Sequence, residues 1–201
     1  MLQKKQELFS NLLVLTLTPV ILTVLFGVLI SIICNGLIEN RNLVDLIVIW
    51  VSMIMGMCVM PLVYLRRTNG KFSMEELGIR RLSNIDVVLL ALVILFLVSG
   101  VFFIPNVKVY DFFQNVPIAF AEEFWCKAIL FYQLRKITNK KYIIIILSAI
   151  IFAFVTHMNG NIETNLLLRM PMGIITGVIY EKDRNLVLPF LLHLVYNIVI
   201  V

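Results

Sequence analysis

The stretch IAFAEEFWCKAILFYQL, residues 118–134, has the length and hydropathy of a membrane-spanning helix and yet contains three charged side chains. They are Glu122, Glu123 and Lys127. Each charge at the centre of a membrane span costs about 3 kcal/mol on insertion scales. Ionisable groups at such depth face the interior of a helix bundle or a water-filled cavity, and they are candidates for function. The stretch therefore predicts a helix bundle in a membrane with a polar site inside it.

The composition extends the membrane interpretation to the whole chain. Of its 201 residues 61% are hydrophobic and 14% are charged, and the mean hydropathy is +0.98. Soluble domains average about half apolar residues and about a quarter charged residues. We therefore predict an all-α fold, a polytopic transmembrane helix bundle surrounded by the lipid bilayer. The net charge of +5 forms no basic stripe with interleaved aromatic residues, which argues against nucleic acid as a partner.

The apolar windows divide the chain into seven predicted membrane spans. The first is longer than the apolar core of a signal peptide and is followed by no small-residue cleavage site, so we expect a retained helix. The last two are short, which leaves a tilted or re-entrant arrangement open. Cys34, Cys58 and Cys126 fall within spans at irregular spacing, which predicts buried free thiols. The predicted spans are residues 11–37, 43–65, 85–105, 116–134, 142–158, 165–180 and 185–201.

Lysine and arginine residues predict the orientation of these spans. With a cytoplasmic N-terminus, 13 of the 17 fall on the inner side and 3 on the outer side, and Lys127 lies within a helix. The outer residues are Arg41, Lys108 and Arg169. Cytoplasmic loops carry the excess of positive charge in multi-pass membrane proteins. We therefore expect a cytoplasmic N-terminus, in an integral protein of what we take to be a bacterial cell membrane.

Helical geometry separates the three charges of the opening stretch. Glu123 and Lys127 are four residues apart and share a helix face, which predicts a supporting ion pair. Glu122 points about 100° away from Glu123 and has no such partner. A carboxylate in that situation suits general acid–base chemistry. A purely structural ion pair remains an alternative for Glu123 and Lys127.

The two histidines of the chain both lie in later spans. His157 ends the fifth span, and His193 stands four residues before Asn197 on one face of the seventh. At 1.5 Å per residue, Glu122, His157 and His193 lie roughly 18–20, 22 and 12 Å from the inner ends of their helices. They can therefore meet in the outer half of the bilayer. An interfacial His157, and an interhelical hydrogen bond by His193 or Asn197, remain open.

Together these residues resemble the CAAX-protease and bacteriocin-processing (CPBP, or Abi) family of intramembrane proteases. Residues 122–127, EEFWCK, are similar to the EExxxR motif of that family, with lysine in place of arginine. His157 matches the FxxxH histidine, although Ala153 takes the phenylalanine position between two phenylalanines. Residues 193–197, HLVYN, match HxxxN, and residues 77–81, LGIRR, resemble a stretch common before the core. The resemblance covers about residues 75–201.

The resemblance implies an intramembrane endopeptidase in which glutamate-activated water cleaves a peptide or membrane-protein substrate, such as a prenylated one. Glu122 would activate the water with the help of His157, and Glu123 would belong to the same site. His193 and Asn197 would stabilise the oxyanion.

A metal site is the alternative use of the same residues. His157, His193 and one glutamate could hold zinc or another divalent metal as three protein ligands. The HExxH motif is absent, and the metal requirement stays open.

The resemblance also implies that the chain consists of two parts. Three functions remain as alternatives. Residues 1–84 would form N-terminal transmembrane helices with a cytoplasmic loop, and residues 85–201 the catalytic core. Because Lys127 and Ala153 depart from the motifs, a non-catalytic bacteriocin immunity protein or membrane scaffold is the alternative to a protease. A small transporter is the third, although we see neither the repeat nor the broken helices expected of one.

Overall fold

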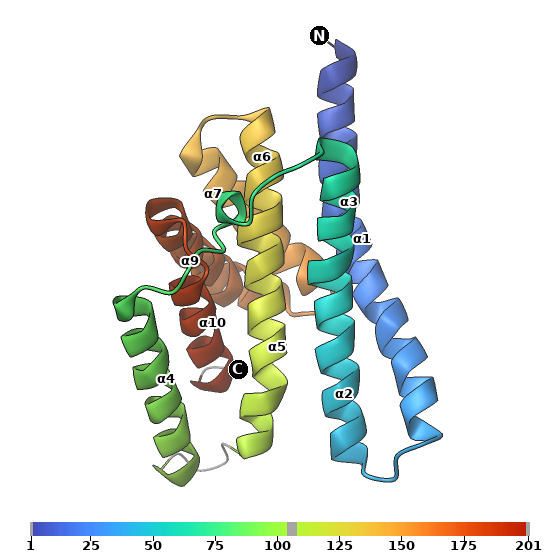
Figure 1. Cartoon of the computed structure of the whole chain (residues 1–201), viewed down its shortest axis with the longest axis vertical. Coiled ribbons are helices and arrows are strands. Elements are labelled where there is room, and N and C mark those ends of the chain that lie inside the picture. Colours follow the sequence, from blue (N-terminus) through green and yellow to red (C-terminus); the bar gives the residue numbers. More distant parts are fainter. Residues whose placement is uncertain (1, 104–107, 200–201) are drawn as a thin grey trace.

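The computed structural model describes residues 2–103 and 108–199, and every element in them is helical. These elements join into seven continuous rods (Figure 1), which confirms the predicted all-α bundle. The predicted span ends at 105 and 201 lie outside the described residues. The rods are α1 (Leu2–Asn35); α2 (Arg41–Met53), η1 (Ile54–Val59) and α3 (Met60–Asn69); α4 (Asn84–Phe103); α5 (Val109–Glu123), η3 (Phe124–Leu130) and α6 (Phe131–Ile137); α7 (Lys141–Ile151) and η4 (Phe152–Thr156); α8 (Ile162–Thr164), η5 (Asn165–Arg169) and α9 (Met170–Asp183); and α10 (Val187–Val199). The loop before α4 holds the short 3₁₀ helix η2 (Glu75–Leu77).

The surface of the bundle is suited to lipid. Three helical segments are long and apolar enough to cross a membrane, namely Lys5–Asn35, Arg41–Asn69 and Ile162–Asp183. Large apolar side chains are exposed on the outer rods, for example Ile32 and Leu167, each 68% exposed. In water such a surface would associate, whereas in a bilayer it faces acyl chains. The chain is an integral membrane protein.

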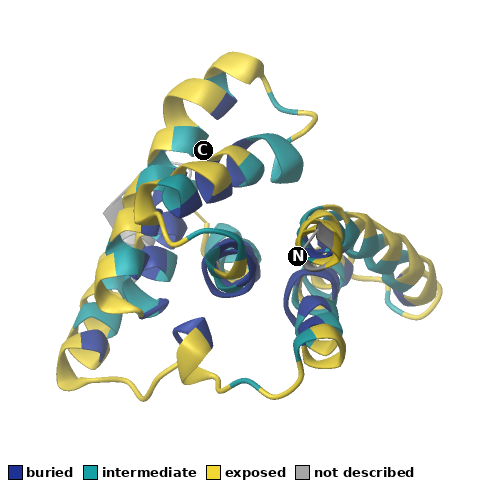
Figure 2. Ribbon diagram, turned by 90° about the horizontal axis from the view of Figure 1, so that it is seen from above, coloured by how far each residue is buried: buried dark blue, intermediate teal, exposed yellow. Residues whose placement is uncertain are grey.

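The rod of α5, η3 and α6 lies at the centre of the bundle. Figure 2 shows it end-on between the N-terminal rods on one side and the C-terminal rods on the other. All seven residues of η3 are buried. A helical segment buried on every side belongs to a bundle core. The charged residues at 122–127 therefore face protein in every direction, which accounts for their presence in an apolar stretch.

Two glycines of α9 bring that helix close to α7. A Cβ atom at Gly173 would lie 3.1 Å from the Cα of Ala149, and one at Gly177 would lie 3.2 Å from the side chain of Ile145. Small residues four apart permit such close approach of membrane helices. The approach places the carbonyl of Gly173 against the central rod, where it accepts a hydrogen bond at 3.1 Å from Lys127 Nζ.

The turn that leads into α10 is tied to the start of α4. Asp86 forms a capping box with Ser83, in which each backbone N–H donates to the other's side-chain oxygen. The second carboxylate oxygen of Asp86 accepts a hydrogen bond from Asn185 Nδ2 at 2.7 Å. Leu186 N–H donates to the carbonyl of Gly78 at 3.3 Å. These contacts fix the position from which α10 carries His193 into the core.

Candidate active site

The charged residues of the central rod lie where its α-helix passes into a π-helix. Glu122 and Glu123 end α5 with 5% and 1% exposure, and Lys127 in η3 is 0% exposed. A π-helix bonds i to i+5, so its turn is wider than that of an α-helix. Within the described part of the chain no salt bridge joins Glu123 to Lys127, whose Nζ donates to the Gly173 carbonyl instead. Lys127 still acts on Glu123 electrostatically. The structure thus replaces the predicted direct ion pair with other partners for both residues.

The partner of Glu123 is His193, which is 1% exposed. His193 Nδ1 lies 3.0 Å from Glu123 Oε1, and Nε2 lies 3.5 Å from Glu122 Oε2. An ionised carboxylate can only accept, so Nδ1–H donates to Glu123. One imidazole thereby faces both glutamates. Two adjacent glutamates can meet the two nitrogens of one ring. The sequence did not reveal the bond to Glu123, because His193 lies 70 residues away and reaches it only through the packing of α10 against α5.

Both glutamates keep an unused acceptor. Glu122 Oε2 and Glu123 Oε2 are buried and accept no hydrogen bond from the described residues. The 3.5 Å separation between His193 Nε2 and Glu122 Oε2 exceeds an ordinary hydrogen bond, although it is close enough for a charge interaction. A buried acceptor in this state is unfavourable for stability and calls for a functional explanation. A general base needs such an acceptor.

Phe152 connects the second histidine to this group. Its ring packs edge-on against His157, with centroids 5.5 Å apart, and against His193, with centroids 5.2 Å apart. Phe152 begins the π-helix η4, and His157 follows the last residue of that helix, five positions after Phe152. The wider π-helical turn brings them together as an α-helical turn would bring residues four apart. Phe152 therefore supplies the aromatic contact that the motif resemblance assigned to the position of Ala153.

The loop that carries His157 is held by residues that the sequence did not single out as functional. Asn165, 2% exposed, donates through Nδ2 to the carbonyl of His157 at 3.0 Å. Its Oδ1 accepts a hydrogen bond from Arg169 Nη1 at 2.6 Å. Gly160 N–H donates to the same His157 carbonyl at 2.9 Å. The four-residue spacing of Asn165 and Arg169 is the feature of the sequence that could have identified this pair, since it is typical of two bonded side chains on one helix.

The structure brings some of the predicted site residues into contact and leaves others apart. Glu122, Glu123 and His193 meet directly. His157 reaches them through Phe152, and Asn197 lies half-buried one turn after His193 on α10. Among the described contacts, no hydrogen bond joins the His157 ring or the Asn197 amide to either glutamate.

The arrangement does not fit the three-ligand metal site that used both histidines. Phe152 packs against both imidazole rings. In the described part of the chain, no group of three or more His, Cys, Asp or Glu side chains is placed to hold a metal ion. The requirement for zinc or another divalent metal stays a prediction.

One protein-family model matches this chain. The family model of the type II CAAX prenyl endopeptidase Rce1-like proteins matches residues 87–199, more than half of the 201 residues. The chain belongs to this family. No curated protein and no solved structure matches it.

The Rce1-like match contains every residue of the candidate site and excludes two rods of the bundle. Residues 1–86 lie before it, including α1 and the rod of α2, η1 and α3. The matched residues carry the general character of a CAAX-type protease. The contacts of the two remaining rods with the matched part indicate what these rods contribute.

Proposed function

We propose that this Rce1-like protein is an intramembrane endopeptidase in which Glu122 activates a water molecule against a peptide bond. The observation that carries the proposal is His193 facing two buried carboxylates, at 3.0 Å from Glu123 and 3.5 Å from Glu122. A protonated imidazole at these distances interacts strongly with buried carboxylates, because water does not screen the charges. The substrate we propose is the C-terminal peptide of a membrane-associated protein, with a prenylated CAAX-type end as the first choice.

The reaction needs one group that takes a proton and later returns it. Glu122 accepts a proton from the water, and the oxygen of that water forms a bond to the carbonyl carbon of the substrate. The tetrahedral intermediate then expels the amine as its C–N bond breaks. Glu122 returns the proton to the leaving nitrogen, so that a carboxylic acid and an amine are released. The unused oxygen Oε2 of Glu122 suits this role.

The other side chains of the site orient His193 and stabilise the charge that develops in the reaction. Glu123 holds His193 through Nδ1–H, which directs Nε2 toward Glu122. An imidazole oriented in this way is suited to stabilise charge that develops beside it. Asn197 offers an amide donor for the oxyanion from the next turn of the same helix. We assign His157, held against Phe152, to the opposite wall of the site.

The proposal also includes a cytoplasmic N-terminus. Figure 1 shows the start of α1, the end of α3 and the turn between α6 and α7 at one end of the molecule, opposite the turn between α1 and α2. Arg66 and Arg67 end α3, and Arg135 and Lys136 end α6. This clustering supports the positive-inside orientation. A reporter fused after Arg67 should behave as cytoplasmic and one near Asn161 as external, whereas the reverse pattern would refute it.

The test of the chemistry is the variant Glu122→Gln, purified in detergent and supplied with a fluorogenic peptide that ends in a farnesylated CAAX sequence. We expect kcat to fall by roughly 10³-fold, because general base catalysis contributes about 10²–10⁴. The matched control is Glu163→Gln, which makes the same exchange on an exposed residue. Equal cleavage by wild type and Glu122→Gln would refute the role of Glu122. Cleavage of the unprenylated peptide at the same kcat/KM would refute the preferred substrate class.

A further inference from the structure

Helix α1 contains a carbonyl that its own backbone cannot satisfy. Pro19 lies inside α1, and proline has no N–H to donate to the residue four positions earlier. That residue is Leu15, which is 1% exposed. A buried carbonyl without a donor costs free energy comparable to a lost hydrogen bond. Figure 1 shows that α1 changes direction part-way along its length, as expected for a helix with an internal proline.

The donor for this carbonyl comes from the central rod. Trp125 Nε1 donates to the Leu15 carbonyl at 2.7 Å, and the Trp125 side chain is 0% exposed. The second tryptophan of the chain repeats the arrangement, since Trp50 Nε1 donates at 2.9 Å to the carbonyl of Phe113. Phe113 stands four residues before Pro117, which lies inside α5. Each tryptophan therefore bonds to a carbonyl that a proline has left free, which shows a specific pairing.

Trp125 begins a series of three anchored residues in η3. Its indole bonds to α1, the carbonyl of Cys126 accepts a hydrogen bond at 3.1 Å from Ser148 of α7, and Lys127 donates at 3.1 Å to Gly173 of α9. Three consecutive residues are thus held by three different helices. A π-helical turn is a local departure from the regular α-helix, so outside contacts determine its position.

We propose that Trp125 is a positioning residue, whose bond to the Leu15 carbonyl fixes the turn that carries Glu122 and Glu123 against His193. Trp125 follows Glu123 by two residues, so a displacement of the indole moves the carboxylates. Helix α1 lies outside the residues that match the family. Through this bond, helix α1 contributes to the candidate active site of this protein. The kinetic part of the proposal rests on the proposed protease function, and the structural part does not.

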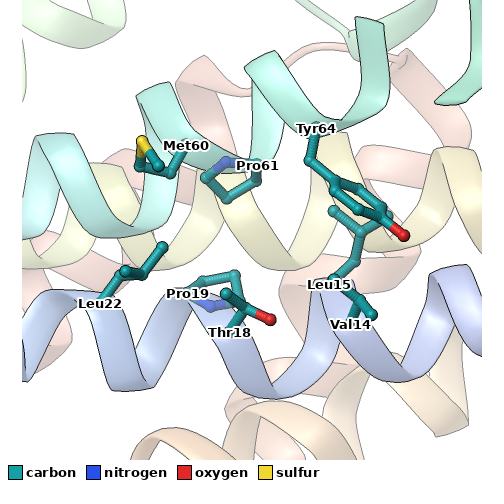
Figure 3. A pocket seen from close by; sticks show the side chains of 8 residues that line it. All are labelled: Val14, Leu15, Thr18, Pro19, Leu22, Met60, Pro61 and Tyr64. Atoms are coloured by element: carbon teal, nitrogen blue, oxygen red, sulfur yellow. The ribbon is translucent and has the colours of Figure 1, made fainter. Parts of the chain in front are cut away.

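The carbonyl side of the bond can be altered without changing any side chain of the central rod. Leu15 and Pro19 border a small apolar cavity of about 100 Å³ between α1 and α3, shared with Met60 and Tyr64 (Figure 3). In Pro19→Ala the removed ring atoms border space that already exists. The new N–H of residue 19 donates to Leu15 within α1 and competes with Trp125. A second bond, from Gln133 to the Leu8 carbonyl at 3.1 Å, keeps α1 attached to the central rod.

The experiment compares the protein with Trp125→Phe, Pro19→Ala and the double variant in detergent. The matched control is Trp50→Phe, which loses the same type of bond at a 40% exposed side chain. The first readout is the ¹⁵N and low-field ¹H spectrum of histidine-labelled protein. Only two histidines contribute, and His157 serves as the internal reference. The second readout is kcat and KM for the peptide of the preceding section, and the third is the melting temperature.

We expect the His193 Nδ1–H resonance to move or broaden in Trp125→Phe and in Pro19→Ala, while the His157 signals persist. kcat should fall roughly ten- to hundredfold with KM unchanged, since displacement of a catalytic group by about 1 Å costs about 10²-fold. In the double variant the Leu15 carbonyl is satisfied again, so the melting temperature should recover relative to Trp125→Phe whereas kcat should not.

Either of two results would overturn the positioning role. One is an unchanged His193 resonance in both single variants, and the other is a double variant that recovers wild-type kcat. If Trp125→Phe fails to fold, the His193 resonance and the kcat of Pro19→Ala decide whether Trp125 has the positioning role. If the wild type cleaves no peptide, the proposed function fails, and the His193 resonance still decides whether Trp125 holds the turn.

Discussion

The π-helical turn η3 and the long helix α1 are both composed mostly of apolar residues, yet their surroundings are opposite. In η3 all seven residues are buried, including Lys127. In α1 the apolar side chains of Leu13, Leu25 and Ile32 are 58–68% exposed. Hydropathy identifies both as membrane segments but does not tell which faces protein. Polar contacts do, as where the buried Leu15 carbonyl of α1 accepts a hydrogen bond from Trp125.

The largest effect expected from this contrast is at Lys127. The variant Lys127→Met keeps the length of the side chain but removes its charge, so the buried Glu123 loses a nearby positive group. Removing one partner from a set of buried charges typically costs about 3–5 kcal/mol. We expect the protein to be depleted in membranes and to melt earlier in detergent.

The control for this prediction is Lys182→Met, on an exposed lysine in the last turn of α9. It should leave both the level and the melting temperature unchanged. If Lys127→Met behaves like Lys182→Met, the charge of Lys127 does not balance that of Glu123.

Phe152 should give the next largest effect. Its ring is 1% exposed and packs against both imidazoles, so Phe152→Ala opens a cavity in the core and costs about 3 kcal/mol. Because His157 and His193 lose the same neighbour, the NMR signals of both should shift. The comparison variant is Phe154→Ala, at a half-buried side chain two residues further on. Equal effects at the two positions would contradict the pairing that we assign to the π-helical turn η4.

The sequence predicted the class of fold well and the local geometry of the site less well. Apolar windows are a strong signal because a bilayer requires about 20 apolar residues in a helix. The α-helical spacing of Glu123 and Lys127 led to an ion pair that the π-helical turn does not form. A π-helix arises when tertiary contacts outweigh regular backbone bonding. The anchors at residues 125–127 come from helices distant in sequence, which local spacing cannot reveal.

A smaller effect is expected at Gly173. The added methyl group of Gly173→Ala would lie 3.1 Å from the Cα of Ala149, a backbone atom that cannot move aside easily. Such overpacking costs about 1–3 kcal/mol. Separation of α9 from α7 should also weaken the bond from Lys127 to the Gly173 carbonyl, so kcat should fall together with the melting temperature. The matched control is Gly36→Ala, where the nearest atom would lie at 3.6 Å and no loss is expected. A normal melting temperature in Gly173→Ala would show that the two helices can separate without cost.

The smallest effect, and the sharpest test of the contrast, is at Leu25 of α1. Leu25 is 58% exposed, and in the bilayer its side chain contacts acyl chains that are as apolar as itself. Leu25→Ala should therefore change the free energy of unfolding by less than about 0.5 kcal/mol. Ile129→Ala, in η3, removes apolar atoms from a side chain that is 0% exposed and should cost about 2–5 kcal/mol. Both variants can be measured by unfolding in mixed detergent micelles. A loss at Leu25 as large as that at Ile129 would show that this face of α1 is covered by protein, as it would be in a dimer, and not by lipid.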